Sequence, residues 1–413
     1  MSVSGQQAGT ADAESASTLP ALTPGPAAGL EIVDAWLAEH ADDLVRWRRH
    51  IHANPELSRA EFATTEFVGE WLTKAGLDYE VLPGGTGIVC DLGPTDRPRI
   101  ALRADMDALP MQEFTGLPFS STAPGVSHAC GHDAHTTVLL GAALALAEAE
   151  ETLPVGVRLI FQPAEEVMPG GALDAVAAGA MVGVDRIFAL HCDPRLEVGK
   201  IGLRTGAITS AADTVELILD SPGGHTSRPH LTSDLVYAIG TVITGLPGLL
   251  SRRVDPRTST VMVWGAVSAG KAPNAIPQTG MLTGTVRTGD HATWELLEPL
   301  VREIVEGLLA PTGVRFQLNY KRGVPPVVND PISVAMFENS ILAMGPEALA
   351  DTPQSGGGED FSWYLEEAPG AMARLGVWSG EGEQLDLHQP TFDIDERALE
   401  VGVRTLTGIV LHA

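Results

Sequence analysis

The stretch Thr136-Thr-Val-Leu-Leu-Gly-Ala-Ala-Leu-Ala-Leu-Ala-Glu-Ala-Glu150, with Val155-Gly-Val-Arg-Leu-Ile-Phe161 soon after it, decides the fold class. The first segment is rich in alanine and leucine and predicts a buried helix, whereas the second is a short apolar run that predicts a buried strand. Similar apolar runs precede the helix at Gly87–Leu92 and Arg99–Arg103 and follow it at Arg186–His191. Strands that alternate with helices are typical of an α/β domain with a mostly parallel sheet.

The middle of the chain has a different order of predicted elements. Strands are expected at Ala212–Leu219, Ser259–Val267, Gly280–Thr288 and Val314–Tyr320, and helices at Ser233–Leu250 and Thr293–Leu309. The resulting β-α-β-β-α-β order is that of a small ferredoxin-like α+β sandwich. We therefore expect an α/β domain formed by residues 29–203 and 322–413, interrupted by an inserted domain at residues 204–321.

The remaining predicted elements belong to the α/β domain. They are helices at Ile32–Ile51, Glu61–Ala75, Pro331–Met344 and Asp395–Leu411, and a strand at Ala371–Val377. Residues 1–28 are rich in Ala, Ser, Thr, Gly and Pro, with no basic start and no continuous apolar core, so they do not match a secretory signal. We expect a flexible leader over this segment.

The charge balance limits the classes of partner. Across 413 residues, 53 acidic side chains stand against 26 basic ones, which gives a net charge of −27. Such an excess disfavours a nucleic-acid backbone or an anionic membrane surface as a partner. Three scattered cysteines are too few for a disulfide framework, and no uninterrupted run of 18 apolar residues is present. We therefore expect a cytoplasmic protein that binds neither nucleic acid nor a membrane.

The densest group of metal-ligand side chains is His128-Ala-Cys-Gly-His-Asp-Ala-His135. Cysteine thiolate and imidazole both bind borderline-soft divalent ions, so four such side chains in one loop favour a metal site. The alternative is a helix N-terminus capped by Asp133, with the histidines facing solvent.

Three further segments place ligand-type residues at or near the ends of predicted strands, where open α/β sheets bind their ligands. They are Glu165-Glu166, His191 and His388. The glutamate pair alone would be read as a solvated turn. Beside a divalent ion, however, one carboxylate can bind the metal while its neighbour takes the proton from the attacking water. Each histidine alone is more typical of a satisfied core residue.

Ten segments, taken in order, carry a family resemblance. They are Arg48–Leu57, Leu102–Pro110, His128–His135, Phe161–Glu166, Ala189–His191, Gly223–His230, Ala272–Pro277, Gly284–Thr288, Gly358–Phe361 and His388. With these segments the chain resembles the amidohydrolase branch of the dinuclear metallopeptidases, which includes aminoacylases, hippurate hydrolases and plant auxin-conjugate hydrolases. The resemblance implies a zinc-peptidase-like α/β catalytic domain with an inserted ferredoxin-like lid and dimerisation domain.

The resemblance also implies the roles of individual residues at the metal site. The implied metal ligands are Cys130, His132, Glu166, His191 and His388. They would hold two divalent ions, zinc or manganese, with cobalt and nickel also compatible with this donor set. Glu165 becomes the general base. Supporting, non-ligand positions are implied for Asp105, Asp107, His128, Asp133 and His135.

The substrate side of the site is implied for the inserted domain. His225 resembles the family histidine that reaches across a dimer to stabilise the oxyanion, whereas Asn274 and Arg287 resemble groups that hold the substrate's free carboxylate. The alternatives are a merely exposed His225 and a surface ion pair at Arg287. The run Gly356-Gly-Gly-Glu-Asp-Phe361 departs from the family pattern, which has a serine before Glu-Asp-Phe.

The expected activity is metal-dependent hydrolysis of the amide bond of a small N-acyl amino acid, to a carboxylate and a free amino acid, by a homodimer. One alternative is a dipeptidase or carboxypeptidase that acts on small peptides. Another is a non-catalytic binding protein that is stabilised by metal. The sequence does not identify the acyl group or the amino acid of the substrate, and it does not select one metal.

Overall fold

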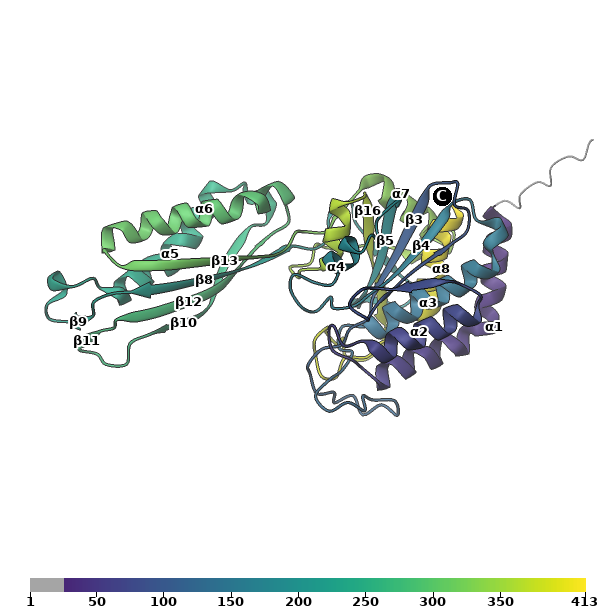
Figure 1. The fold of residues 1–413 in the computed structure, drawn as a ribbon, viewed down its shortest axis with the longest axis horizontal. Coiled ribbons are helices and arrows are strands. Elements are labelled where there is room, and N and C mark those ends of the chain that lie inside the picture. The colour runs from purple at the N-terminus through teal and green to yellow at the C-terminus, as the bar shows by residue number, and fades with distance from the viewer. Residues whose placement is uncertain (1–25) are drawn as a thin grey trace, which may run out of the picture.

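The computed structural model describes residues 26–413 and shows two lobes, each built on its own sheet (Figure 1). In the large lobe the sheet contains β1 (Tyr79–Val81), β2 (Ile88–Leu92), β3 (Arg99–Asp105), β4 (Gly156–Gln162), β5 (Arg186–Glu197), β6 (Ile201–Leu203), β15 (Leu349–Asp351) and β16 (Gly370–Trp378). Its helices are α1 (Pro26–Ala53), α2 (Phe62–Lys74), α3 (His132–Glu148), α4 (Ala172–Ala177), α7 (Pro331–Leu342) and α8 (Ala398–Leu411). Residues 1–25 of the predicted leader lie outside the described residues, and its residues 26–28 belong to α1.

The strand order of the large sheet is β1-β2-β4-β3-β5-β16-β6-β15. Strand β3 runs parallel to both β4 and β5, and β16 runs parallel to β5. Because β4 lies on one side of β3 and β5 on the other, the strand order reverses at β3. Open α/β sheets bind ligands at such a point, outside the carboxyl ends of the strands.

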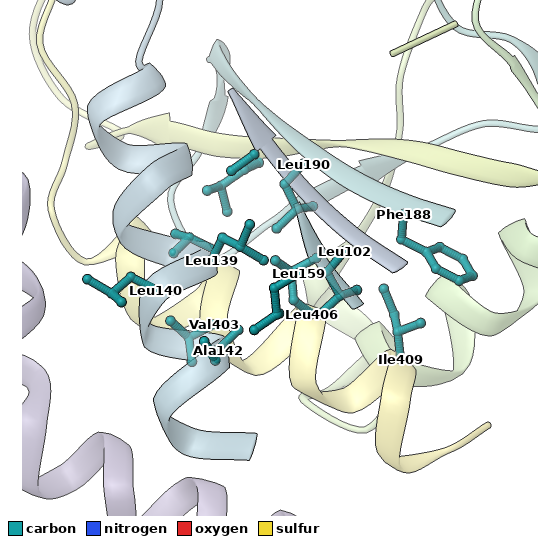
Figure 2. Close-up of a cluster of buried hydrophobic side chains, with 14 of the residues drawn as sticks. Leu102, Leu139, Leu140, Ala142, Leu159, Phe188, Leu190, Val403, Leu406 and Ile409 are labelled. Carbon is teal, nitrogen blue, oxygen red and sulfur yellow. The ribbon is translucent and has the colours of Figure 1, made fainter. Parts of the chain in front are cut away.

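Helices α3 and α8 cover one face of the large sheet. Helix α3 is buried around nearly its whole circumference, as its alanine- and leucine-rich sequence predicts. Figure 2 shows side chains of α3 and α8 packed against strand side chains, among them Leu139, Ala142, Val403, Leu406, Leu102, Leu159 and Phe188. This apolar layer supports the strands whose carboxyl ends carry the predicted site.

The opposite face of the large sheet has a smaller apolar cluster. Alternation along the strands sends Ala101, Ile160 and Ile187 to this face, while their neighbours Leu102, Leu159 and Phe188 face α3 and α8. Helix α4 and the 3-10 helix η6 (Asp360–Glu366) contribute the covering residues. With both faces buried, the strands read as near-continuous apolar runs. The predicted α/β fold class is thus confirmed.

The small lobe consists of β8 (Ala211–Asp220), α5 (Leu235–Arg253), β10 (Val261–Ala269), β12 (Thr279–Thr288), α6 (His291–Leu309) and β13 (Arg315–Val324). Its strand order is β10-β12-β8-β13, with every neighbouring pair antiparallel. This is the ferredoxin-like arrangement, and its two helices pack on one face of the sheet around a separate core. Among the described residues, one helix, α5, has the length and apolar composition of a membrane span. Helices packed on a sheet, as α5 is, pass the same test.

The structure also shows elements that the sequence patterns do not predict. Two short ladders, β7 (Gly206–Ala207) with β14 (Val328–Asn329) and β9 (Gly224–His225) with β11 (Ala275–Ile276), are too short to carry a period-2 pattern. Helix α3 begins at His132 rather than at the expected Thr136. Its first turn therefore includes part of the predicted metal loop.

Candidate metal centre

The carboxyl side of the large sheet brings the five predicted metal ligands together. Cys130 precedes α3, His132 begins it, Glu166 follows β4, His191 lies in β5 and His388 follows β16. Cys130 Sγ lies 3.7 Å from His191 Nε2 and 3.4 Å from His388 Nε2. Glu166 Oε1 lies 3.3 Å from His388 Nε2 and 3.8 Å from His132 Nε2. Each of the five belongs to a group of side chains whose ligand atoms could hold a metal ion.

The hydrogen bonds of two histidines leave their Nε2 atoms free for a metal. His132 Nδ1 donates to the Asp107 carbonyl at 2.9 Å, and His191 Nδ1 donates to the Cys192 carbonyl at 2.8 Å. His132 Nε2 and Glu166 Oε1 are buried and have no hydrogen-bond partner among residues 26–413. Buried polar atoms without a partner are costly, and a cation would satisfy both. The thiol, imidazole and carboxylate donors therefore fit a borderline-soft divalent ion.

The carboxylate of Asp107 links the proposed base to the ligands. It accepts the backbone N–H groups of Glu165 and Glu166, both at 3.0 Å, and the Ser58 hydroxyl at 2.6 Å. Burial raises the pKa of Asp107, but hydrogen bonding to His132 and its other donors outweighs this and lowers the pKa overall. The ionised Asp107 carboxylate thus orients both glutamates, while the backbone carbonyl of the same residue orients the His132 ring.

His135 is excluded as a ligand by its own hydrogen bonds. Its Nδ1 donates to Asp105 Oδ1 at 2.6 Å, and its Nε2 accepts the backbone N–H of Cys192 at 2.8 Å. Both ring nitrogens are therefore occupied, although Asp105, His132 and His135 are close enough to form a metal-binding group. Asp105 also accepts from Arg103 Nη1 at 2.7 Å. Asp105 and His135 thus act as supports of the loop.

The solvated alternative for the loop from His128 to His135 is wrong. All three of its histidines are buried, and Asp133 accepts hydrogen bonds from Arg48 Nε at 2.7 Å and His52 Nδ1 at 2.8 Å. Burial raises the pKa of Asp133, but the Arg48 charge and the His52 hydrogen bond bring it well below its usual range. Burial lowers the pKa of His128 to about 4. The loop is therefore anchored inside the large lobe.

Backbone conformation at three residues shapes the cluster. Gly131 has a φ of 89°, and a Cβ atom there would come within 2.9 Å of Cys192 Sγ, so only glycine fits between two ligands. Ala164, directly before the glutamate pair, has a φ of 60°, and His388 has a φ of 59°. Left-handed conformations of non-glycine residues are strained and concentrate at functional sites.

Glu165 lies at a cavity of about 310 Å³ whose lining includes the ligands Cys130, Glu166, His191 and His388. Its side chain is 7% exposed. Burial, followed by the negative charges of Glu359 and Glu166, raises the pKa of Glu165 well above its ordinary value. A neighbouring divalent cation would oppose this shift. The position and environment suit a group that accepts and returns a proton.

The structure separates the three predicted substrate-side residues. Arg287 lines the cavity, where its Nη1 donates to the Gly356 carbonyl. His225, in β9, and Asn274, directly before β11, are exposed, and the β9–β11 ladder lies at the far end of the small lobe (Figure 1). Neither residue lines the cavity. Within one chain, therefore, Arg287 alone of these three joins the ligand cluster.

Sequence reasoning assigned no role to three charged residues of the site, although two of them, Glu359 and Asp360, lie in the segment Gly358–Phe361 that carries the resemblance. Arg374 in β16 and Glu359 both line the cavity, and Asp360 lies in a potential metal-binding group with Glu165 and Glu359. Burial raises the pKa of Asp360 to about 8, although Arg103 opposes the shift. A signal for Arg374 was present, because it is the lone charged residue in the predicted apolar strand Ala371–Val377.

Comparisons with known proteins place the chain in a family. Residues 101–412 match the family described as Peptidase family M20/M25/M40. The chain is 57% identical over 367 residues to a Rhodococcus jostii (strain RHA1) protein provisionally named glutamate–cysteine ligase 2-3, covering 89% of this chain but 46% of that protein. The chain thus spans about half the length of this relative.

Two Bacillus subtilis proteins match over most of their length. The N-acetyl-L-cysteine deacetylase of strain 168 is 37% identical over 357 residues, with 86% of this chain and 84% of that protein covered. The solved structure of the YxeP protein, described as a dinuclear metal binding peptidase from the M20 family, superposes with a TM-score of 0.80 at 33% identity. That match covers 91% of this chain and 98% of the other. The resemblance inferred from the ten sequence segments is therefore confirmed.

Proposed function

The chain belongs to peptidase family M20/M25/M40, and from this premise we propose that it hydrolyses the amide bond of N-acyl amino acids, releasing a carboxylate and a free amino acid. The observation that carries the proposal is the convergence of five ligand-type side chains and the buried carboxylate of Glu165 on one cavity. The N-acetyl-L-cysteine deacetylase name of a 37% identical relative supports the substrate class.

The proposed cofactor is a pair of divalent ions, zinc or manganese. The residues that would hold them are Cys130, His132, Glu166, His191 and His388. When bound, such ions polarise the scissile carbonyl and make water acidic enough to attack near neutral pH. The free Nε2 of His132 and the unpartnered Oε1 of Glu166 support this assignment, as does the dinuclear metal binding described for the YxeP protein.

Glu165 is the proposed general base. Its side chain lines the cavity, and its backbone N–H is held by Asp107, which also orients the ligands His132 and Glu166. Asp107 thus sets the position of the base relative to the ligands, through its carboxylate for the two glutamates and through its backbone carbonyl for His132. Glu165 takes a proton from the attacking water and returns it to the amine that leaves.

The substrate's free carboxylate is assigned to Arg287, whose guanidinium can form a bidentate pair with it. We place His225 and Asn274 in the cavity of a second copy of the chain, because both are exposed and far along the small lobe from their own cavity. There His225 stabilises the oxyanion, and Asn274 assists in holding the carboxylate.

A homodimer formed through the small lobe follows from this assignment. The edge strand β10 exposes Val261, Val263 and Val267, and α5 exposes Val236 and Tyr237. An unpaired strand edge with apolar side chains is a natural surface for association. We also retain a cytoplasmic location as a proposal, supported by the three free, buried cysteines.

A second candidate function is cleavage of small peptides, which the family description and the YxeP protein both favour. A mass-spectrometric panel of N-acyl amino acids and free dipeptides, run with chelated and metal-restored protein, separates the two functions. We expect release of free amino acids from the N-acyl substrates, loss on chelation, and recovery with zinc or manganese. Cleavage of dipeptides alone would favour the second candidate, and metal binding without any turnover would contradict both.

A further inference from the structure

Arg374 is a buried cation beside the metal ligands. It lies in β16 opposite His191 of the parallel strand β5, and side chains of paired residues on adjacent strands project from the same face of a sheet. Arg374 is 7% exposed and lines the same cavity as Glu165 and the ligands. The protein therefore holds a guanidinium group at the wall of its proposed active site.

Two other buried arginines, Arg48 and Arg103, are paired with carboxylates, whereas Arg374 is not. Arg48 contacts Asp133 at 2.7 Å, and Arg103 contacts Asp105 and Asp360 at 2.7 Å each. Among residues 26–413, no carboxylate oxygen lies within 4.0 Å of the Arg374 guanidinium, and this group donates no hydrogen bond. The guanidinium nitrogens of Arg374 are not among the fully buried atoms without a partner, so they are accessible from the cavity and can pair with an anionic group of a ligand.

The two carboxylates whose charges act most strongly on Arg374 already pair with other arginines. Glu359 Oε1 lies 3.2 Å from Arg103 Nη2, and Asp193 contacts Arg195 through both carboxylate oxygens, at 3.0 and 3.1 Å. Burial lowers the pKa of Arg374, and the charges of Glu359 and Asp193 offset the effect only in part. Both carboxylates are therefore engaged elsewhere and do not form an ion pair with Arg374.

We propose that Arg374 binds a second carboxylate of the substrate, in addition to the one assigned to Arg287. This inference rests on the proposed function and narrows its substrate class to N-acyl amino acids with two carboxylates. The two guanidinium groups enter the cavity from different lobes, Arg287 from β12 and Arg374 from β16. A cavity of about 310 Å³ is near the lower end of the range of about 300–1,000 Å³ for ligand sites, which favours a short dicarboxylate.

The second carboxylate can belong to the acyl group or to the amino-acid side chain, and matched substrates distinguish these sources. N-succinylalanine is compared with its neutral amide, N-succinamoylalanine, and N-acetylglutamate is compared with N-acetylglutamine. In each pair only the second carboxylate changes. We expect the wild-type protein to prefer the charged member of one pair by about 10- to 100-fold in kcat/KM, as a charge-assisted hydrogen bond in a buried site provides.

The variant R374M tests the residue, with R195M as the matched control. Arg195 is a neighbouring cation bound to Asp193 and does not line the cavity. R374M should lower the preference for the charged substrate at least tenfold, mainly through KM, whereas R195M should retain it. R374K keeps the charge but loses the planar fork, so a partial loss is expected. Since R374K introduces no apolar side chain, it also serves if R374M does not fold.

Two outcomes would overturn the assignment. In the first, the wild-type protein cleaves charged and neutral members equally. In the second, R374M slows both members of a pair by the same factor, which would indicate a structural role. If the wild-type protein cleaves no N-acyl amino acid, the proposed function fails, and calorimetry with succinate on the metal-loaded protein then tests Arg374 separately. Binding that weakens at least tenfold in R374M but not in R195M supports the assignment, and equal binding in both variants rejects it.

Discussion

The ligand cluster of the large lobe and the distal end of the small lobe carry two parts of one predicted site, but they are built differently. Cys130, His132 and Glu165 are buried, and hydrogen bonds to Asp107 tie His132 and Glu165 together. His225 and Asn274 are exposed, and their described contacts are with residues at or next to the β9–β11 ladder. One chain therefore assembles the metal ligands and the base. The residues proposed to stabilise the oxyanion and to hold the carboxylate, by contrast, reach a cavity only if a second chain provides it.

The difference follows from how each region is held. Parallel strands end at the same edge of the sheet, so residues from distant parts of the chain meet there without any assembly step. The β9–β11 ladder, by contrast, pairs only two residues of each strand, and it lies at the end of a lobe that has its own core. Changes in the large-lobe cluster should therefore act within one chain, and changes at the distal end should act between chains.

The largest effect is expected for Glu165→Gln. The amide keeps the shape of the side chain but cannot take a proton, so turnover should fall by about 10²- to 10⁴-fold. Metal content, measured by mass spectrometry of the purified protein, should stay near that of the wild type because the substitution leaves every proposed ligand in place. A variant with normal metal content and normal turnover would remove Glu165 from the mechanism.

A somewhat smaller effect is expected for His225→Ala, the matching change at the distal end. Loss of one oxyanion donor should lower kcat by about 10²- to 10³-fold without changing metal content or KM substantially. His230, exposed in the same segment, provides the control, and His230→Ala should keep its activity. If His225→Ala keeps wild-type activity, as His230→Ala is expected to do, His225 is an exposed residue with no role in turnover.

Asp107→Asn probes the support of the cluster and should have a milder effect. The substitution removes the negative charge that accepts from the two backbone N–H groups, while the Asp107 backbone carbonyl that accepts from His132 stays in place. Loss of such an outer contact typically lowers metal affinity or activity about 10- to 100-fold, which a competitive metal titration would measure. Ser58→Ala, which removes only the hydroxyl donor to Asp107, should change the affinity less. An unchanged affinity in Asp107→Asn would contradict the supporting role.

The smallest effects are expected at helix caps, one in each lobe. Asp330 accepts from the Ser333 N–H at 2.8 Å and caps α7, while Asp290 accepts from the Thr293 N–H at 2.7 Å and caps α6. Replacing either aspartate by alanine should cost about 1 kcal/mol in the free energy of unfolding. Thermal unfolding measures both effects. If each variant shifts a different thermal transition, the two lobes unfold as independent units.

The contribution of Asp330 should depend on pH in a defined direction. Partial burial raises its pKa, but the Ser333 hydrogen bonds and Arg186 outweigh this and lower it overall. A lowered pKa in the folded state gives stabilisation that is present above the unfolded value of about 3.9 and is lost as the pH falls through the folded value. The difference in unfolding free energy between wild type and Asp330→Ala should thus be constant near pH 7 and shrink below about pH 4. A difference that is unchanged at pH 3 would contradict this.

The parts of the molecule that could be predicted from sequence are those set by local patterns. Apolar strands followed by Glu165-Glu166 and by His191 indicate both the sheet and the edge where the ligands meet. The burial of His128 could not be predicted, because it depends on the distant Arg48 and His52 that hold the loop through Asp133. The separation of His225 from its own cavity was implied by the resemblance, but it could not be derived from local patterns, because it depends on how the two lobes are connected.

The most direct test of the account combines the two regions in one assay. Glu165→Gln and His225→Ala proteins are each purified, shown to be nearly inactive, then mixed and allowed to exchange subunits. In a mixed dimer, the chain that keeps Glu165 receives an intact His225 from its partner. Random exchange should restore about a quarter of wild-type activity, because half of the dimers are mixed and each has one complete site. Activity that stays at the average of the two variants, with subunit exchange verified by native mass spectrometry, would contradict a site shared between two chains.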